Sequence, residues 1–252
     1  MTIKNIHLPT IDSTSNEAHR LLASGAELPD LTIIEADDQT AGRGQVGNSW
    51  ETEAGKNIIF SLVCHPVWVH PAQQYVLSES IALAVVKALA RQMSDEMAQY
   101  LSVKWPNDIY FRDRKISGTL IECDLLGKSV SNCIVGTGVN INQQVFRSDA
   151  PNPVSLINIL GRETDRTLVL RDIITLFSEY YERIRQGEQP AIHAEYKSRL
   201  YRNDGHLYPY SDAQGPFLAR ITDVEPSGRL LLETADGECR RYEFKEVRFE
   251  HK

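Results

Sequence analysis

Three separated segments of the sequence combine glycines, cations and a carboxylate in ways that suit binding of a small acid or a nucleotide. The first is the glycine-rich stretch 42–47, in which Arg43 stands between two glycines. Glycines let the backbone approach a ligand closely, and a guanidinium engages a carboxylate or a phosphate with two parallel hydrogen bonds. The stretch therefore indicates an anion site; taken alone, it could also be a surface loop with a solvated arginine.

The second segment places lysines on both sides of a carboxylate. It reads Lys-Trp-Pro-Asn-Asp at 104–108, and Lys115 opens the run Lys-Ile-Ser-Gly-Thr-Leu-Ile-Glu that ends at Glu122. Taken alone, the Trp-Pro-Asn-Asp run would be an ordinary turn at the end of a strand, and a single lysine before a strand is usually solvated.

The third segment, 136–142, places Gly136 and Gly138 inside an apolar strand. Glycines weaken a strand unless a bulge or a closely approaching ligand needs the space. We therefore expect something to pack against this backbone. Three such segments at strand ends together predict an enzyme that activates its substrate with a nucleotide.

The spacing of the stretch 42–47 also fits GxGxxG, the pattern of dinucleotide-binding sites. Such a site needs a strand before the glycines, a helix after them, and an acidic residue about 20 positions further on. Residues 48–57 instead lead into a strand, and no acidic residue stands about 20 positions beyond Gly42. This context disfavours a nicotinamide cofactor.

Hydrophobic periodicity predicts the elements that position these segments. Helices are expected at 14–26, 73–93, 168–186 and 191–201. Strands are expected at 31–36, 57–63, 116–125 and 130–141, and the last two should form a hairpin around Leu126-Gly127-Lys128. The glycine-rich loop should therefore lie between two strands.

After residue 205 the pattern changes to short strands separated by turn signals. These strands are expected at 217–224, 230–234, 239–244 and 247–249. The fold class predicted is α+β, with a mixed β-sheet and helices in a domain at 1–202 and a small β-barrel at 203–252.

The amino-acid composition of the chain disfavours some classes of binding partner. The net charge of −7 and the isoelectric point near 5.5 argue against binding to nucleic acid, which requires clustered cations. Residues 1–5 do not resemble a signal segment, and no run approaches the roughly 20 apolar residues of a membrane span, so we expect a soluble, cytoplasmic protein. The cysteines lack a CxxC pair and are expected to be buried free thiols: Cys64, Cys123, Cys133 and Cys239.

In their order along the chain, these motifs resemble those of the biotin–protein ligases. The resemblance spans nearly the whole chain, and Lys-Trp-Pro-Asn-Asp followed at this distance by Lys-x-x-Gly-x-Leu-x-Glu is highly specific. It rests on Asp12-Ser13-Thr14, Gln39-Thr40-Ala41-Gly42-Arg43-Gly44, Trp50, 104–108, Lys115-Ile116-Ser117-Gly118 and Gly136-Thr137-Gly138-Val139-Asn140. The family implies a catalytic domain like that of class II synthetases at 1–202 and an SH3-like domain at 203–252.

The resemblance also implies a two-step reaction. The biotin carboxylate attacks the α-phosphate of ATP to give biotinyl-AMP and pyrophosphate, and a lysine of a biotin carboxyl carrier domain then attacks the mixed anhydride. Mg²⁺ would screen the phosphates, although the resemblance does not identify its ligands. Arg43 and Lys115 would neutralise developing charge, and Lys104 and Asp108 would lie near the phosphates and metal, unless Lys104 merely pairs with Asp108 to fix the turn.

Substrate-binding residues follow from the same resemblance. The implied biotin site comprises Ser13, Thr14, Gln39, Gly42, Arg43, Lys115, Gly118, Gly136 and Gly138, of which the first three would hydrogen-bond the ureido ring and the last three would leave room for the ring and the valeryl chain. The implied ATP site comprises Arg43, Gln45, Trp50, Lys104, Asn107 and Asn140. Trp50 would cover the adenine and the two asparagines would read its edge; the alternative is that Trp50 is a core tryptophan.

The sequence departs from the family pattern at Gln45 and Asn48, where many bacterial members have arginine. The lower charge predicts weaker retention of the adenylate, over which the loop 39–50 is expected to fold. The motif at 12–14 leaves no room for the N-terminal helix-turn-helix of the family's repressors, so no contact with DNA is expected. The resemblance is also compatible with a homodimer.

Two alternative functions remain open from the sequence. The chain could be a lipoate–protein ligase-like acyltransferase, or it could be a non-catalytic biotin-binding protein.

Overall fold

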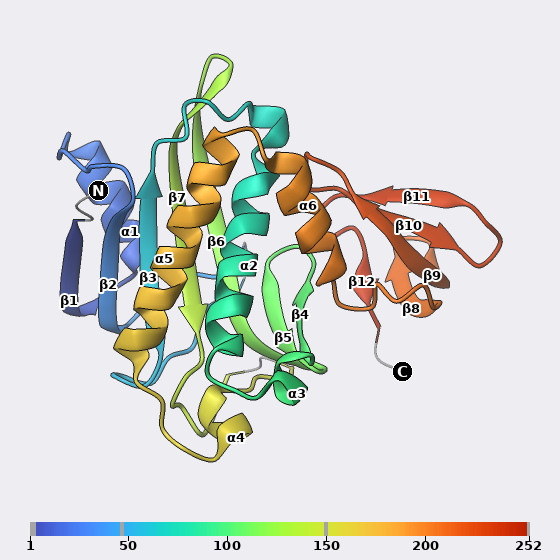
Figure 1. The fold of residues 1–252 in the computed structure, drawn as a ribbon, viewed down its shortest axis with the longest axis horizontal. Helices are drawn as coiled ribbons and strands as arrows, with labels where there is room; N and C mark the ends of the chain where they lie inside the picture. The colour runs from blue at the N-terminus through green and yellow to red at the C-terminus, as the bar shows by residue number, and fades with distance from the viewer. Residues whose placement is uncertain (1–3, 46–47, 149–150, 251–252) are drawn as a thin grey trace.

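The computed structural model describes residues 4–45, 48–148 and 151–250, and its core is a seven-stranded mixed sheet (Figure 1). The strands follow the order β1-β2-β3-β7-β6-β5-β4, with β1 parallel to β2 and the other neighbours antiparallel. Their bounds are β1 Asn5–Ile11, β2 Thr32–Gln39, β3 Ile58–Cys64, β4 Leu101–Lys104, β5 Asp108–Phe111, β6 Arg114–Leu126 and β7 Ser129–Val139.

Helices cover both faces of this sheet because its central strands are apolar on both sides. Ile33 of β2 belongs to the main core, which includes α2 and α5, whereas the next residue, Ile34, packs in a smaller core with Ala18 of α1. Successive side chains of a strand point to opposite faces. The helices are α1 Thr14–Ala23, α2 Tyr75–Ala90, α3 Asp95–Ala98, α4 Leu156–Leu160, α5 Arg166–Arg185 and α6 Gln189–Ser198, with a 3-10 turn at Pro71–Gln73.

The second sheet is antiparallel and formed by the C-terminal residues. Its five strands follow the order β11-β10-β9-β8-β12. Their bounds are β8 Tyr208–Asp212, β9 Gly215–Val224, β10 Leu230–Thr234, β11 Cys239–Tyr242 and β12 Arg248–Phe249. This confirms the predicted α+β class with a separate β-structure at the C-terminus, and we propose 202/203 as the domain boundary.

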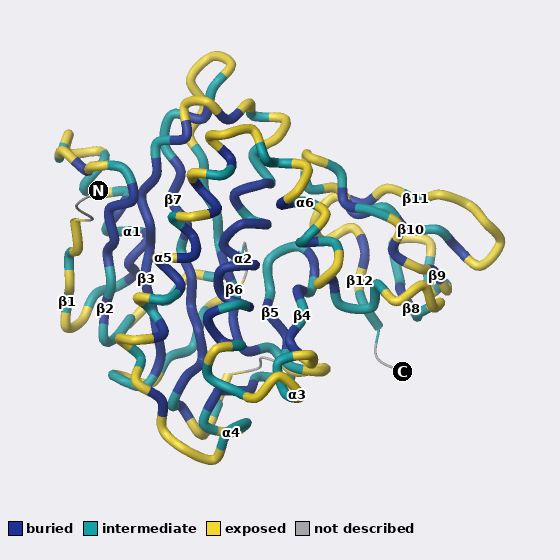
Figure 2. The backbone as a smooth tube through the Cα atoms, in the orientation of Figure 1, coloured by how far each residue is buried: buried dark blue, intermediate teal, exposed yellow. Residues whose placement is uncertain are grey.

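The predicted helices and strands are present, with ends shifted by a few residues, but several short elements were missed. β1 is an exposed edge strand interrupted by Pro9, and β8 contains Pro209, so neither gives a clear strand pattern. The turn between β6 and β7 was predicted correctly, with Gly127 at a φ of 61°. Figure 2 shows that β3 is buried along its length, as its almost continuous apolar run predicts.

The four cysteines differ in their exposure to solvent. Cys64 and Cys133 are buried, as predicted, but Cys239 is exposed and Cys123 is only half-buried, because they lie on strands with one accessible face. Among the described residues no helix combines the length and apolar character needed to cross a bilayer.

A carboxylate-flanked histidine links helices α2 and α6 to the C-terminal sheet. His193 of α6 has its Nδ1 2.7 Å from Glu79 of α2 and its Nε2 3.1 Å from Asp223 of β9, and Lys197 also contacts Asp223 at 3.0 Å. The hydrogen bond to Glu79 raises the pKa of His193, although partial burial opposes this. Burial raises the pKa of Glu79 above its ordinary value despite the histidine.

We expect the free energy of unfolding to fall as the pH rises through the titration of His193. Because His193 and Glu79 both bind protons more tightly in the fold than in the unfolded chain, the folded state is favoured at lower pH. The contribution of His193 is complete below about pH 6.5, its unfolded pKa, and is lost as the pH rises through its higher folded pKa. Urea unfolding at about pH 6 and about pH 8 should show this loss, and His193→Gln should reduce it.

The matched control for this prediction is His70→Gln. The Nδ1 atom of His70 accepts a backbone N–H from Ala72 and does not bridge carboxylates. This variant should keep the pH dependence of the wild type. If His193→Gln also kept it, the histidine bridge would not be the cause.

Candidate active site

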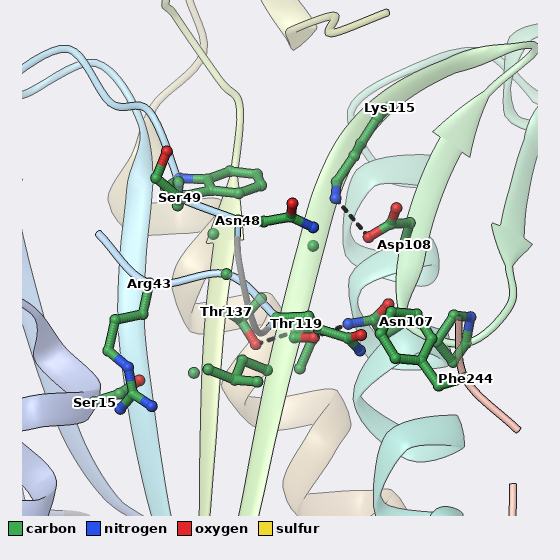
Figure 3. Close-up of a pocket in the computed structure, with 18 of the residues that line it drawn as sticks. Ser15, Arg43, Asn48, Ser49, Asn107, Asp108, Lys115, Thr119, Thr137 and Phe244 are labelled. Atoms are coloured by element: carbon green, nitrogen blue, oxygen red, sulfur yellow. Dashed lines mark hydrogen bonds and ion pairs between the residues drawn. The ribbon is translucent and has the colours of Figure 1, made fainter. Parts of the chain in front are cut away.

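A pocket of about 490 Å³ brings the three sequence segments together at the glycine-containing halves of β6 and β7 (Figure 3). Its walls come from the start of α1, the loop after β2, the 104–108 turn, β6 and β7, and the C-terminal segment 244–249. Most of the predicted site residues line it: Ser13, Thr14, Gln39, Arg43, Gln45, Trp50, Lys104, Asn107, Asp108, Lys115, Gly118, Gly136 and Gly138. Gly42 and Asn140 are absent from this lining, and Val46 and Gly47, the end of the GxGxxG spacing, lie outside the described residues.

One end of the pocket is a polar network at the start of α1. The backbone N–H of Thr14 donates to Gln39 Oε1 at 2.8 Å, and the Thr14 hydroxyl lies 2.9 Å from that of Ser61. The Ser15 hydroxyl lies 3.1 Å from the same Ser61 oxygen. Because the Oε1 atom of Gln39 is committed to Thr14, its amide NH₂ group is the part of the side chain left to donate to a ligand.

Glycines in β6 and β7 form the floor under Trp50. A Cβ atom at Gly138 would overlap the indole ring of Trp50, and one at Gly136 would overlap Ser15 Oγ. A Cβ at Gly118 would lie 3.2 Å from the same indole and 3.1 Å from Lys115 Nζ. These close approaches confirm the expectation that something packs against the glycines.

Trp50 lines the pocket and is not part of either hydrophobic core, so the alternative interpretation that it is a core tryptophan is wrong. Its indole N–H is buried without a hydrogen-bond partner among the described residues, and so is Gln45 Oε1. A buried N–H or C=O group without a partner is costly, so both atoms are suited to interact with a bound ligand.

Lys115 and Asp108 form the pocket's ion pair. Lys115 Nζ lies 2.6 Å from Asp108 Oδ1, with both side chains less than one-third exposed. Neighbouring strands β5 and β6 position the two residues, and the register shifts between Ile109 and Tyr110. The ammonium group is also 5.8 Å from the centre of the Trp50 ring, so it faces the space above the glycines.

Lys104 lies on the other side of the 104–108 turn in an aromatic setting. Its Nζ donates to the Tyr110 hydroxyl at 3.1 Å and lies 5.3 Å from the centre of the Phe249 ring. Burial lowers the pKa of Lys104. Because the Asp108 carboxylate is engaged by Lys115, the geometry favours a pocket-facing role for Lys104 over the option that it only fixes the turn.

Arg43 is held by a carboxylate in this structure. Its guanidinium forms two hydrogen bonds with Glu122, at 3.0 and 2.7 Å, and one with Asn16 at 3.2 Å. Figure 3 shows Arg43 directed toward Ser15 and away from Lys115 and Asp108. The structure therefore brings Arg43 to the pocket, but it does not place the guanidinium beside Lys115.

Glu122 was not identified from the sequence as an Arg43 partner. Burial opposes its ionisation, but hydrogen bonds from Arg43 and His19 outweigh this and lower the pKa of Glu122. His19 Nε2 is 3.2 Å from the same carboxylate. Arg43 must give up this pair before it can engage a substrate anion.

Glu122→Gln should therefore make Arg43 more available. A partly exposed ion pair contributes about 0.2–1 kcal/mol, so we expect the KM for the acid substrate to fall by up to about fivefold. Steady-state kinetics would measure this. In the Arg43→Met background the same change should have no effect; an equal decrease there would show that Glu122 acts through another group.

The two asparagines that were expected to hydrogen-bond the edge of adenine differ in their position relative to the pocket. Asn107 lines the pocket and its side-chain amide donates to the Thr119 carbonyl oxygen. Asn140 is buried, donates to the Val154 carbonyl oxygen at 3.1 Å, and has an Oδ1 atom without a partner among the described residues. A nucleotide role for Asn140 stays a prediction.

The C-terminal segment supplies pocket residues that the sequence did not reveal. These are Phe244, Lys245, Val247, Arg248 and Phe249. Among the described lining residues the cations are Arg43, Lys104, Lys115, Lys245 and Arg248, while the carboxylate is Asp108. An acidic protein has thus concentrated positive charge in one cavity, as the binding of phosphates and a carboxylate requires.

The model of the biotin/lipoate A/B protein ligase family matches residues 8–140, which is more than half of the chain. The chain belongs to this family. The matched region contains most of the pocket, including the glycine-rich loop, the Lys115–Asp108 pair and the glycines of β6 and β7. The cations of the C-terminal segment lie outside it.

The similar proteins within this family include ligases that are named for biotin. The bifunctional ligase/repressor BirA of Bacillus spizizenii is 29% identical over 239 residues, which cover 92% of this chain and 70% of the relative. The biotin–[acetyl-CoA-carboxylase] ligase of Mycobacterium tuberculosis is 29% identical over 224 residues, covering 88% and 80%. The biotin protein ligase of Aquifex aeolicus, solved with biotin and ATP, matches with a TM-score of 0.76 and 25% identity, covering 98% of this chain and 99% of that one.

Proposed function

We propose that this chain is a biotin–protein ligase that forms biotinyl-AMP from biotin and ATP and transfers biotin to a lysine of a carrier protein. The observation that carries this proposal is the convergence of the polar network, the glycine floor and the cations in one pocket. Similarity over nearly the whole chain to a ligase solved with biotin and ATP supports it.

In the first step, a carboxylate oxygen of biotin attacks the α-phosphorus of ATP, and pyrophosphate leaves. Both reactants are anions, so the protein must neutralise charge at the point where they meet. We propose that Lys115 does this from its place above Gly118, and that Arg43 joins it after leaving Glu122. Thr14 and Gln39 would fix the ureido end of biotin.

Mg²⁺ is proposed as the ion that accompanies the ATP phosphates. It is typically held in proteins by one or two carboxylates together with substrate phosphates, and Asp108 is a carboxylate lining this pocket. When bound, the ion would neutralise phosphate charge. Among the described residues there is no cluster of three or more His, Cys, Asp or Glu side chains arranged for a metal, so the substrate would have to supply much of the coordination.

In the second step, the amine of a carrier lysine attacks the anhydride carbonyl carbon, and AMP leaves. Similarity to a biotin–[acetyl-CoA-carboxylase] ligase supports a biotin carboxyl carrier domain as the acceptor. A homodimer and a cytoplasmic location stay predictions.

A direct test is to incubate the protein with ATP, Mg²⁺, biotin and a biotin carboxyl carrier domain, and to weigh the carrier by mass spectrometry. We expect the carrier to gain one biotinyl group at its lysine, only when ATP is present. An unmodified carrier with biotin bound to the protein would instead support a non-catalytic binding protein.

Gln45→Arg should slow the release of biotinyl-AMP. A guanidinium in the loop would add an attraction to the adenylate phosphate of about 1 kcal/mol, so release should slow roughly fivefold. Release can be followed by trapping free biotinyl-AMP with hydroxylamine. Gln144→Arg, a change outside the pocket lining, serves as the control for added charge; equal release from Gln45→Arg and wild type would contradict the prediction.

A further inference from the structure

A pair of thiols lies on neighbouring strands away from the pocket lining. Cys123 of β6 and Cys133 of β7 are directly opposed in the antiparallel ladder. Their Sγ atoms are 3.1 Å apart, which is hydrogen-bond distance for two sulfur atoms. Neither residue lines the pocket, so the proposed ligase reaction leaves this pair unexplained.

The backbone at this position suits a covalent bond between the two sulfurs. Directly opposed residues in antiparallel strands have Cα atoms about 4.5–5.5 Å apart, and a disulfide bridges about 4.4–6.8 Å. The ladder therefore does not need to separate or slide for the bond to form. The register shift between Asp124 and Leu125, next to the pair, is a local irregularity at which the ladder is less constrained.

The two thiols differ in a way that assigns them roles. Cys133 is fully buried, and Cys123 is half-buried, so an oxidant from solvent reaches Cys123 first. The hydrogen bond between the two thiols lowers the pKa of Cys123, whereas the same hydrogen bond and burial raise the pKa of Cys133. The thiolate is the reactive form toward peroxides.

We propose that Cys123 and Cys133 form a peroxide-reactive pair that is converted to a cross-strand disulfide, with Cys123 as the attacking thiol and Cys133 as the resolving one. The Cys123 thiolate attacks one oxygen of a hydroperoxide; an S–O bond forms, the O–O bond breaks and hydroxide or alkoxide leaves. Cys133 then attacks the Cys123 sulfur, the S–O bond breaks, and water leaves with the Cys133 proton. Two thiols are oxidised and one peroxide is reduced.

A third thiol makes the test more specific. Cys64 of β3 is opposed to Cys133 on its other side and is fully buried, whereas Cys239 is exposed on the C-terminal sheet. Cys64 is therefore an alternative partner for Cys133, and Cys239 is an alternative site of first oxidation. The contact of 3.1 Å assigns the bond to Cys123.

The experiment is to treat the folded protein with hydrogen peroxide, block remaining thiols with iodoacetamide, and map peptides by mass spectrometry without reduction. We expect a peptide pair joined through Cys123 and Cys133 that has lost two hydrogen atoms, with Cys64 alkylated after unfolding. Cys64→Ser and Cys239→Ser should keep the bond. A bond between Cys64 and Cys133, or oxidation of Cys239 while Cys123 stays free, would overturn the proposal.

A trapping experiment tests the order of attack. In Cys133→Ser the sulfenic acid on Cys123 cannot be resolved by its partner, so dimedone should label Cys123, whereas wild type should show little label. The wild-type peptide map stands independently if this variant does not fold. Dimedone labelling of Cys133 in Cys123→Ser at the same rate would contradict the assigned roles.

Discussion

Replacing Lys115 by alanine should lower the rate of biotin adenylation by roughly 100- to 1000-fold, the effect of removing one donor that stabilises transition-state charge. The ammonium faces the space above Gly118 and is within 2.6 Å of Asp108. Its removal leaves the attack of one anion on another without this cation, and leaves Asp108 unpaired beside incoming phosphates. Biotin-dependent release of pyrophosphate would measure the loss.

The matched control is Lys128→Ala, which removes a lysine from the exposed turn between β6 and β7. It should keep the wild-type rate, and thermal unfolding should show that Lys115→Ala remains folded. The ion pair that the variant loses is partly exposed, so the expected loss of stability is about 1 kcal/mol or less. Near-normal adenylation by Lys115→Ala would remove this residue from its proposed role.

Replacing Gly138 by valine should lower adenylation by about 10- to 100-fold. A Cβ at this position overlaps the Trp50 indole, and adding atoms to a filled space costs about 1–3 kcal/mol. Because Trp50 sits on a loop and the floor is a strand, we expect the indole to be displaced. The KM for ATP should rise and the tryptophan fluorescence should change.

Ser131→Val on the same strand is the control for Gly138→Val. It introduces a β-branched side chain at a residue outside the pocket, so it should leave both substrates' KM values unchanged. Unchanged adenylation in Gly138→Val would show that the space above the glycine is not used by the nucleotide.

Much of this fold was predictable because the spacing of apolar residues along the sequence reflects which side of each helix or strand is buried. The long helix α2 is apolar on nearly all sides and is buried as such, and β3 is an almost continuous apolar run that is buried along its whole length. β5 was not predicted, because it has only four residues and is a strand through its pairing with β4 and β6.

The site was predictable where its residues cluster in motifs. Lys104–Asp108 and Lys115 both lie in one segment of chain, and the structure places them in one pocket. Arg43's partner could not be foreseen, because Glu122 lies 79 residues away and the two meet only when the sheet forms. The same holds for Lys245 and Arg248, which reach the pocket from the turn after β11 and from β12 and belong to no recognisable motif.

The acid that this pocket activates can be identified by the exchange of labelled pyrophosphate into ATP in the presence of either biotin or lipoate. The polar network of Thr14, Gln39 and Ser61 is suited to a ligand end that has both N–H and C=O groups, which the ureido ring of biotin has and the dithiolane ring of lipoate lacks. We predict exchange with biotin and none with lipoate. Exchange with lipoate alone, or none with biotin, would contradict the proposal that this pocket activates the biotin carboxylate.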